Sequence, residues 1–190
     1  LSGAMDFTGT NLTLNAAVDS SATVEVTNSG TFTTAAAGDI TSTGTFTQNG
    51  AGTNSLAGNI TTTDSNISFA KAITLTGDVA MSSGTGAGTL TYSEAIDGTD
   101  DNTQSLTLTA GTGNIDFDAA VGATKDLKDV TVVSAANVDT DSTFAASTYT
   151  QSAGTGTTQF DGAVTLSGAM DFTGTNLTLN AAVDSSATVE

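Results

Sequence analysis

The sequence predicts an all-β fold of the parallel β-helix or β-solenoid type, and three observations lead to this prediction. Threonine-rich stretches such as Leu106–Thr109 alternate apolar and polar residues with period two, which is typical of strands. Glycine, asparagine and aspartate interrupt these stretches at short intervals, and no segment shows a helical apolar stripe. A degenerate pattern recurs every 20–25 residues or so, a period typical of solenoids.

The recurring pattern reads Thr or Asn, apolar, any, apolar, any, any, Ala, apolar. Its two apolar residues lie two apart, so both point inward on one strand. Alanine is small enough for a tight corner, and the last apolar residue begins the next face. The leading Asn suits the left-handed backbone that corners need, and stacked Asn side chains can hydrogen-bond along the axis. The copies are Asn11–Val18, Asn66–Ile73, Thr89–Ile96, Asn114–Val121 and Thr157–Val164.

The chain also contains a longer repeat, since residues 166–190 are identical to residues 1–25. Shared packing does not preserve identity at solvent-facing positions, so the copy indicates tandem duplication. We therefore expect residues 1–165 to form one tandem solenoid unit of about 7–8 rungs, and residues 166–190 to start the next identical unit. A rung cannot bury its apolar edge alone, and uncapped strand edges template further pairing. The piece is expected inside a longer chain or stacked head to tail.

The predicted core is thin and built from Leu, Ile, Val and Ala together with a stack of aromatic residues. In one copy of the pattern, Ile115 and Phe117 face inward while Asp116 and Asp118 face water. The fold is expected to need no cofactor, because stability would come from axial hydrogen bonds and rung stacking. The aromatic residues expected to stack are Phe7, Phe69, Tyr92, Phe117 and Phe160.

The composition excludes several function classes. The chain carries a net charge of −17, and its hydrophobic content of 37% is too high for a solvated disordered tail. This acidity argues against nucleic-acid and anionic membrane partners and favours solubility, repulsion between fibres and uptake of divalent cations. No apolar run reaches the roughly 18 residues of a membrane span. Without His, Cys or Arg the usual catalytic bases and nucleophile pairs are missing, so no enzyme is predicted.

Two groups of acidic residues are candidate metal ligands. Asp97, Asp100 and Asp101 form the densest oxygen-ligand cluster and follow a strand, so they are candidates for calcium, although a solvated turn is the simpler and preferred explanation. The outward pairs Asp116/Asp118 and Asp139/Asp141 are expected to form axial carboxylate rows if rungs stack in register. Such rows repel unless a cation bridges them.

The outward threonines suggest a binding surface as an alternative. Thr-x-Thr on a flat solenoid face is the pattern of ice-binding surfaces, and Thr41–Thr43 and Thr61–Thr63 show it. Because the copies do not recur at constant spacing, a flat two-column array is not expected. Threonine is also a good strand residue wherever a strand faces water.

Several segments resemble the repeats of filamentous-haemagglutinin-like exoproteins of the two-partner-secretion type. The resemblance lies in Gly113–Gly122, in Gln104–Gly111, and in Phe160–Val164 followed by Thr165–Gly168. The same composition and degenerate repeat pattern extend over the whole chain. The resemblance implies a giant secreted bacterial protein with a right-handed parallel β-helix and a role in adhesion or surface structure. No site residue of that family has a counterpart here.

Together these observations predict a structural extracellular fibre or adhesin shaft of tandem β-solenoid repeats at the bacterial cell surface. The expected partners are identical neighbouring repeats along the fibre axis, covalent or head-to-tail, and a host or cell-surface glycan. Neither nucleic acid nor membrane insertion is expected. The alternatives are a self-assembling filament or sheath of stacked subunits, and an ice- or glycan-binding Thr-rich surface.

Overall fold

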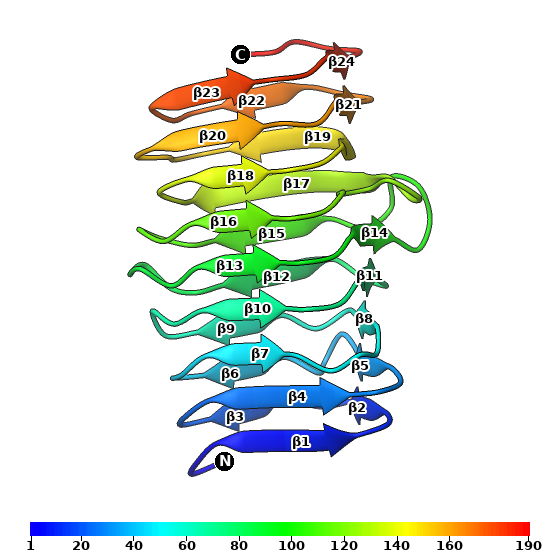
Figure 1. Ribbon diagram of the computed structural model, residues 1–190, viewed down its shortest axis with the longest axis vertical. Coiled ribbons are helices and arrows are strands. Elements are labelled where there is room, and N and C mark those ends of the chain that lie inside the picture. Colours follow the sequence, from blue (N-terminus) through cyan, green and yellow to red (C-terminus); the bar gives the residue numbers. More distant parts are fainter.

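The computed structural model describes all 190 residues and consists of strands, turns and bends without a helix. The chain winds as a three-faced prism, with the N-terminus at one end of the stack and the C-terminus at the other (Figure 1). Strands of successive rungs pair in parallel on each face, which confirms the predicted all-β parallel β-solenoid. No helix is long and apolar enough to cross a membrane.

Each rung visits three faces in the order A, B and C. Face A contains β1 (Met5–Gly9), β4 (Val24–Asn28), β7 (Phe46–Gln48), β10 (Ile67–Phe69), β13 (Leu90–Tyr92), β16 (Ile115–Phe117), β18 (Val138–Thr140), β20 (Thr157–Phe160) and β23 (Asn176–Leu179). Face B contains β2 (Leu12–Leu14), β5 (Phe32–Thr34), β8 (Asn54–Leu56), β11 (Ile73–Leu75) and β14 (Ile96–Gly98), and its column continues through the first half of β19 to β21 (Val164–Leu166) and β24 (Val183–Ser185). Face C contains β3 (Val18–Ser20), β6 (Ile40–Ser42), β9 (Ile60–Thr62), β12 (Val79–Ser82), β15 (Leu106–Thr109) and β22 (Met170–Phe172).

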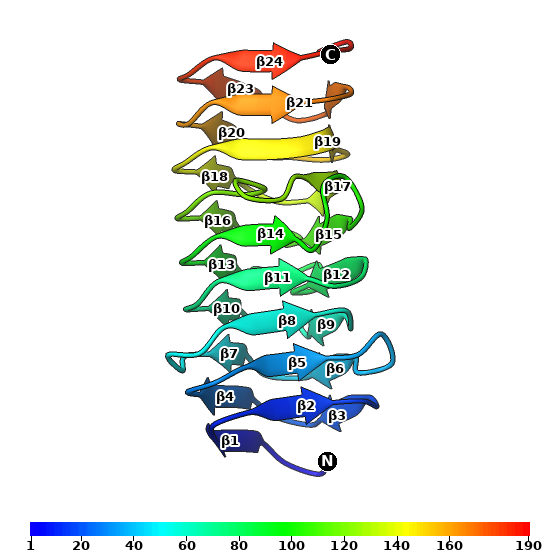
Figure 2. The same ribbon diagram turned by 90° about the vertical axis from the view of Figure 1, so that its right-hand side faces the viewer.

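Two long strands cross the corner between faces B and C. They are β17 (Leu127–Ser134) and β19 (Phe144–Gln151), and Figure 2 shows them in line with both neighbouring columns. The first half of β19 pairs with β21 on face B, and its second half pairs with β22 on face C. Isolated bridges from Val121 to Ile96 and to Phe144 keep face B continuous between β14 and β19. Eight of the nine face A strands, β1 to β20, begin within residues 1–165, which confirms about 7–8 rungs per unit.

The core follows the predicted period of two along each strand. The pattern buried, accessible, buried recurs in most three-residue strands, and 34 buried apolar residues form one continuous cluster along the axis. Alternate side chains of a strand point to opposite faces, so a three-residue strand places up to two residues in the interior and the longer β4, β17 and β19 place three or four. The prism therefore has a thin core that extends through every interior rung.

The predicted aromatic stack is confirmed for its central members. Phe69 and Tyr92 lie 6.3 Å apart between ring centroids, and Tyr92 and Phe117 lie 5.1 Å apart. Phe7 does not join the stack, because it is only partly buried and its register partner is Val26.

Phe160 is buried but also lies outside the predicted stack. Thr140 separates it from Phe117 in the register of face A, and its ring instead contacts Phe144 and Tyr149 at 5.4 and 5.3 Å. The sequence motif did not point to Phe32, Phe46, Phe144 or Tyr149, which are all buried.

The motif asparagines connect rungs through their side chains. The Oδ1 of Asn66 accepts a hydrogen bond from the backbone N–H of Thr89, at 2.9 Å. The Oδ1 of Asn114 accepts from the Nδ2 of Asn137, at 3.0 Å, so one direct Asn–Asn step of the predicted ladder exists. The predicted left-handed backbone at these asparagines is wrong, because positive φ among non-glycine residues occurs only at Asp64 and Asn102. The asparagines serve as acceptors for the next rung instead.

One copy of the motif lies on a different face from the others. The strands that start at Asn66, Thr89 and Asn114 run on face A and continue to face B. Asn11–Val18 instead runs from face B to face C, because β1 pairs with β4 and occupies face A before it. Pairing with the neighbouring rung, and not the motif itself, decides which face a segment occupies.

Replacing Thr140 with valine is expected to stabilise the fold by about 1–2 kcal/mol. Its Oγ1 is buried without a hydrogen-bond partner, and valine has nearly the same shape without the hydroxyl. The matched control is Thr158→Val, because the equally buried Oγ1 of Thr158 hydrogen-bonds the Oε1 of Gln151 at 2.8 Å. Urea unfolding should show opposite signs for the two variants, and destabilisation by Thr140→Val would contradict the assignment.

Candidate functional site

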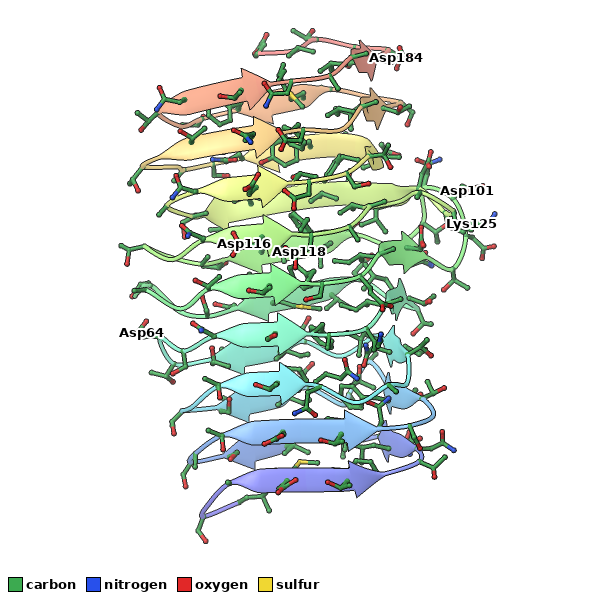
Figure 3. All side chains as sticks on the ribbon, in the orientation of Figure 1. Asp64, Asp101, Asp116, Asp118, Lys125 and Asp184 are labelled. Atoms are coloured by element: carbon green, nitrogen blue, oxygen red, sulfur yellow. The ribbon has the colours of Figure 1, made fainter.

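Carboxylates gather on the outer side of face A, where β16, β18 and β20 stack. Asp116 and Asp139 are register partners in the middle of β16 and β18, so the predicted axial row is present. The residues that follow each of these strands continue a second row beside the first. We name this set the acidic ridge: Asp116, Asp118, Asp139, Asp141 and Asp161. Figure 3 shows Asp116 and Asp118 on the outer side of β16.

The most compact part of the acidic ridge is a trio of exposed carboxylates. Oxygen atoms of Asp139, Asp141 and Asp161 lie within 4.8 Å of one another. The Oδ1 of Asp161 also accepts hydrogen bonds from the Nε2 of Gln159 at 3.0 Å and from the Nδ2 of Asn180 at 2.6 Å. Hard divalent cations prefer such oxygen ligands, so this trio is where one cation would find three carboxylates within reach.

Partial burial and the crowding of like charges together raise the pKa of two carboxyls of the acidic ridge. Partial burial, together with the charges of Asp118, Asp139 and Asp141, raises the pKa of Asp116 above its usual value. Partial burial and the charges of Asp141 and Asp161 likewise raise the pKa of Asp139. A carboxyl whose pKa is higher in the folded than in the unfolded state stabilises the fold at low pH, and this contribution is lost as pH rises through the folded pKa. The ionisation of Asp116 and Asp139 therefore opposes folding at neutral pH.

We expect Asp139→Asn to raise the melting temperature at pH 7 by roughly 2–4 °C, equivalent to about 1 kcal/mol for a chain of this size. The amide keeps the shape of the side chain and removes a partly buried charge together with its repulsion from Asp141 and Asp161. The parent protein should become more stable as pH falls from 7 toward the usual carboxyl value of 3.8, and the variant should gain less over this range.

The control is Asp100→Asn, which changes the net charge equally but lies in an exposed loop away from the acidic ridge. Thermal melts followed by circular dichroism at several pH values measure both variants. An equal rise in melting temperature for Asp100→Asn would mean that total charge, and not local crowding, sets the effect.

The second predicted group is divided between a strand and a loop: Asp97 lies in β14 on face B, and Asp100 and Asp101 lie on the loop that follows it. The Oδ1 of Asp97 accepts hydrogen bonds from the backbone N–H groups of Thr124 and Lys125, at 2.8 and 3.2 Å. Asp101 forms an ion pair with Lys125 at 3.2 Å, and Figure 3 shows both side chains on this loop. The close grouping of three acidic oxygens occurs at the acidic ridge and not among Asp97, Asp100 and Asp101. Calcium at this loop stays a prediction.

All three lysines of the chain have acidic partners. Besides the pair on the loop, Lys71 contacts Glu94 at 2.6 Å and Lys128 contacts Asp129 at 3.7 Å. The hydrogen bond from Lys71 lowers the pKa of Glu94. Since each lysine is paired locally, no cation is left over to balance the acidic ridge, and the surface outside these pairs is strongly negative.

Outward threonine and serine residues form ladders on the other two faces. On face C, Thr41 pairs with Thr61 in register, and Thr61 pairs with Ser82. On face B, Thr13, Thr33, Ser55 and Thr74 follow one another, and Asp97 is next in the column. Threonine is thus aligned along the axis even though its spacing in the sequence varies, because rungs differ in length at the corners.

Asp161 is the one member of the acidic ridge that was not predicted from the sequence. The signal was present, since Asp161 follows Phe160 in the copy Thr157–Val164 just as Asp118 follows Phe117 in Asn114–Val121. Aligning the copies on the inward residue, and not on the paired acids alone, would have found it.

The chain matches no protein-family model, no curated protein and no solved structure. The resemblance to filamentous-haemagglutinin-like exoproteins therefore depends on the repeat segments themselves.

Proposed function

We propose that this chain is part of a structural extracellular fibre or adhesin shaft, built by tandem 165-residue units that join end to end in one continuous solenoid. The role of such a shaft is mechanical: it holds a binding part at a distance from a cell surface. Its negative surface keeps neighbouring shafts apart and soluble.

The observation that supports this proposal most strongly is the join between the two copies. Residues of the second copy continue the stack of the first without a break on all three faces, as β23 pairs with β20, β24 with β21, and β22 with β19. Side chains also bridge the join, since Asn180 donates to Asp161 at 2.6 Å. A unit that accepts the start of its own sequence at its end is suited to repetition.

The outermost rungs leave strand edges and apolar side chains that a further unit would cover. The strands β1, β2 and β3 each have a partner on one side only, as do β23 and β24. Leu179 in β23 is 39% exposed, whereas Phe160 in the rung before it is 1% exposed. Unpaired edges of this kind favour pairing with another strand, and an identical unit provides the matching sequence.

Chains of one, two and four whole units test the proposal. Rungs stack about 4.8 Å apart, so each added unit should lengthen a rod by roughly 37 Å at constant width. Small-angle X-ray scattering and negative-stain electron microscopy measure both dimensions. A length that does not grow with the number of units would overturn the proposal.

A self-assembling filament of separate subunits is the second form of the same architecture. It would arise if the open edges of the first and last rungs paired between chains. Native material boiled in detergent with a chelator separates the two forms on an agarose gel. A covalent array gives a band of very high mass, whereas stacked subunits of this length give a band near 18.6 kDa.

The threonine ladders favour an ice- or glycan-binding surface as a second candidate function. Hydroxyls aligned along faces B and C offer a regular set of donors and acceptors. Thermal hysteresis measured on the two-unit chain tests ice binding, and a glycan array tests sugar binding. Activity would have to fall when Thr41 and Thr61, which are register partners, are both replaced by valine.

A surface location is tested on cells that produce the protein. Antibodies against the unit should label intact cells, and added protease should remove that label without breaking the cells. Labelling only after permeabilisation would overturn the extracellular part of the proposal.

A further inference from the structure

We infer that successive units of the array are turned by one face of the prism relative to each other, so that any surface feature returns to the same face only in every third unit. This inference rests on the proposed tandem array and specifies its geometry. It follows from where the structure places two identical stretches of sequence.

The repeated 25 residues occupy different faces in their two copies. Figure 1 shows β1 among the face A strands and β22 in the column behind them, although both contain the sequence Met-Asp-Phe. Figure 3 shows Asp184 on β24, on the same side as the face B strands. Its counterpart Asp19 lies in β3 on face C. The three pairs of strands are β1 on A and β22 on C, β2 on B and β23 on A, and β3 on C and β24 on B. The strands β3 and β24 belong to one hydrogen-bonded sheet only because β17 and β19 cross the corner, and β24 continues the face B column through β21, Phe144 and Val121 to Ile96.

Contacts within each copy survive this change of face. Met5 pairs with Val24 in the first copy, and Met170 pairs with Val189 in the second. The Oγ of Ser20 donates to the carbonyl of Gly3 at 2.8 Å, and the equivalent pair in the second copy lies at 2.7 Å. The repeated sequence therefore determines which of its segments are neighbours, and these contacts form on whichever faces the segments occupy.

The cause of the shift is the number of strand positions in one unit. Between Met5 and Met170 the chain passes eight positions on face A, eight on face B and seven on face C, 23 in all. Three positions make one rung, so 23 positions make seven rungs and two further strands. The next unit begins two faces further on, which is the same as one face back. After three units the chain has completed 23 whole rungs, roughly 110 Å of fibre.

This geometry distributes each surface feature around the fibre. The acidic ridge lies on face A of one unit and would lie on face C of the next and on face B of the third. Every side of the shaft would then carry the same negative patch at the same axial interval. Repulsion between shafts would not depend on how they are turned, and a partner that binds one unit could approach from any side.

The same geometry bears on the threonine ladders. A ladder on face C of one unit would be continued on that face by a different segment of the next unit. Flat binding surfaces for crystals need one uninterrupted face, so rotation favours the shaft over the ice-binding alternative.

Cross-linking of the chain itself tests the placement at the join. The outward residue Thr165 is the register partner of Asp184, so the pair T165C and D184C should form a disulfide under mild oxidation. Paired positions in neighbouring strands lie within the Cα separation that a disulfide spans. If the second copy instead kept the faces of the first, the pair T165C and T178C would cross-link. The chain contains no cysteine of its own, so any disulfide that forms must join the two introduced residues.

Cryo-electron microscopy of a chain of six whole units tests the rotation directly. The expected rod advances roughly 37 Å per unit with each unit moved by one face, and the density repeats on one face only after roughly 110 Å. A rod whose units keep the same face would overturn this inference and leave the proposed shaft intact. A chain that forms no rod would overturn both.

Discussion

Replacing Phe69 with alanine is expected to lower the free energy of unfolding by about 3–5 kcal/mol, the usual cost of deleting a buried aromatic side chain. Phe69 is fully buried, and its ring centroid lies 5.2 Å from that of Phe46 and 6.3 Å from that of Tyr92. A thin solenoid core has no second layer that could collapse into the cavity, because each rung contacts only the rung on either side. Urea unfolding and a melt should both report the loss, with a fall in melting temperature of roughly 10 °C.

Two variants sharpen this test. Phe7→Ala removes the same ring from the first rung, where Phe7 is only partly buried, and should cost clearly less. Phe69→Leu keeps most of the volume and should cost under about 1.5 kcal/mol. Hydrogen exchange of Phe69→Ala should rise first in β7, β10 and β13, since coupling in a solenoid runs between adjacent rungs. Equal losses for Phe7→Ala and Phe69→Ala would show that burial does not decide the effect.

The inward and outward positions of the strands could be predicted from the sequence. The pattern at Ile115, Asp116 and Phe117 gave the correct side for each residue. This succeeded because alternation is a local property of the pleated backbone and needs no knowledge of neighbouring rungs. The parallel solenoid followed from the same alternation together with its period.

The face occupied by a segment could not be predicted from its own residues. Leu12 and Leu177 have identical neighbours in sequence, yet Leu12 lies on face B and Leu177 on face A. A face is assigned by counting strands from the previous rung, and that count needs every corner of the unit. For this reason the motif copy Asn11–Val18 begins on face B, whereas the copies Asn66–Ile73, Thr89–Ile96 and Asn114–Val121 begin on face A.

The acidic ridge was predicted in part. The stacking of Asp116 on Asp139 was predicted on the condition that successive rungs stack in register, and the structure confirms it. Asp161 was missed because the prediction looked for two acids two residues apart, and Gln159 stands at the position of the first acid, as the register partner of Asp139. Corner lengths set such partners, and they depend on glycine-rich turns whose conformation the motif does not describe.

Replacing Gly52 with alanine is expected to cost about 3 kcal/mol or more, because the new methyl group would meet backbone that cannot move away. A Cβ at Gly52 would lie 1.7 Å from the carbonyl oxygen of Gly30 and 2.8 Å from the Nδ2 of Asn28. The backbone of Gly30 is held by a hydrogen bond from its N–H to the carbonyl of Thr10, at 2.7 Å. The clash therefore falls on a corner that three successive rungs share.

The same corner contains a buried polar network that the clash would open. The Nε2 of Gln48 donates to the Oδ1 of Asn28 at 2.7 Å, and the Nδ2 of Asn28 donates to the carbonyl of Gly30 at 2.9 Å. Both amides are almost fully buried, so losing a partner leaves a polar group without water or protein to replace it. The control is Gly3→Ala, since a Cβ at Gly3 meets nothing within 4 Å and should change stability by less than about 1 kcal/mol. Urea unfolding of both variants measures the difference in stability. If Gly52→Ala were as stable as Gly3→Ala, the corner would have to be loosely packed. Neither the close approach of the rungs nor the buried network would then contribute to holding the rungs together.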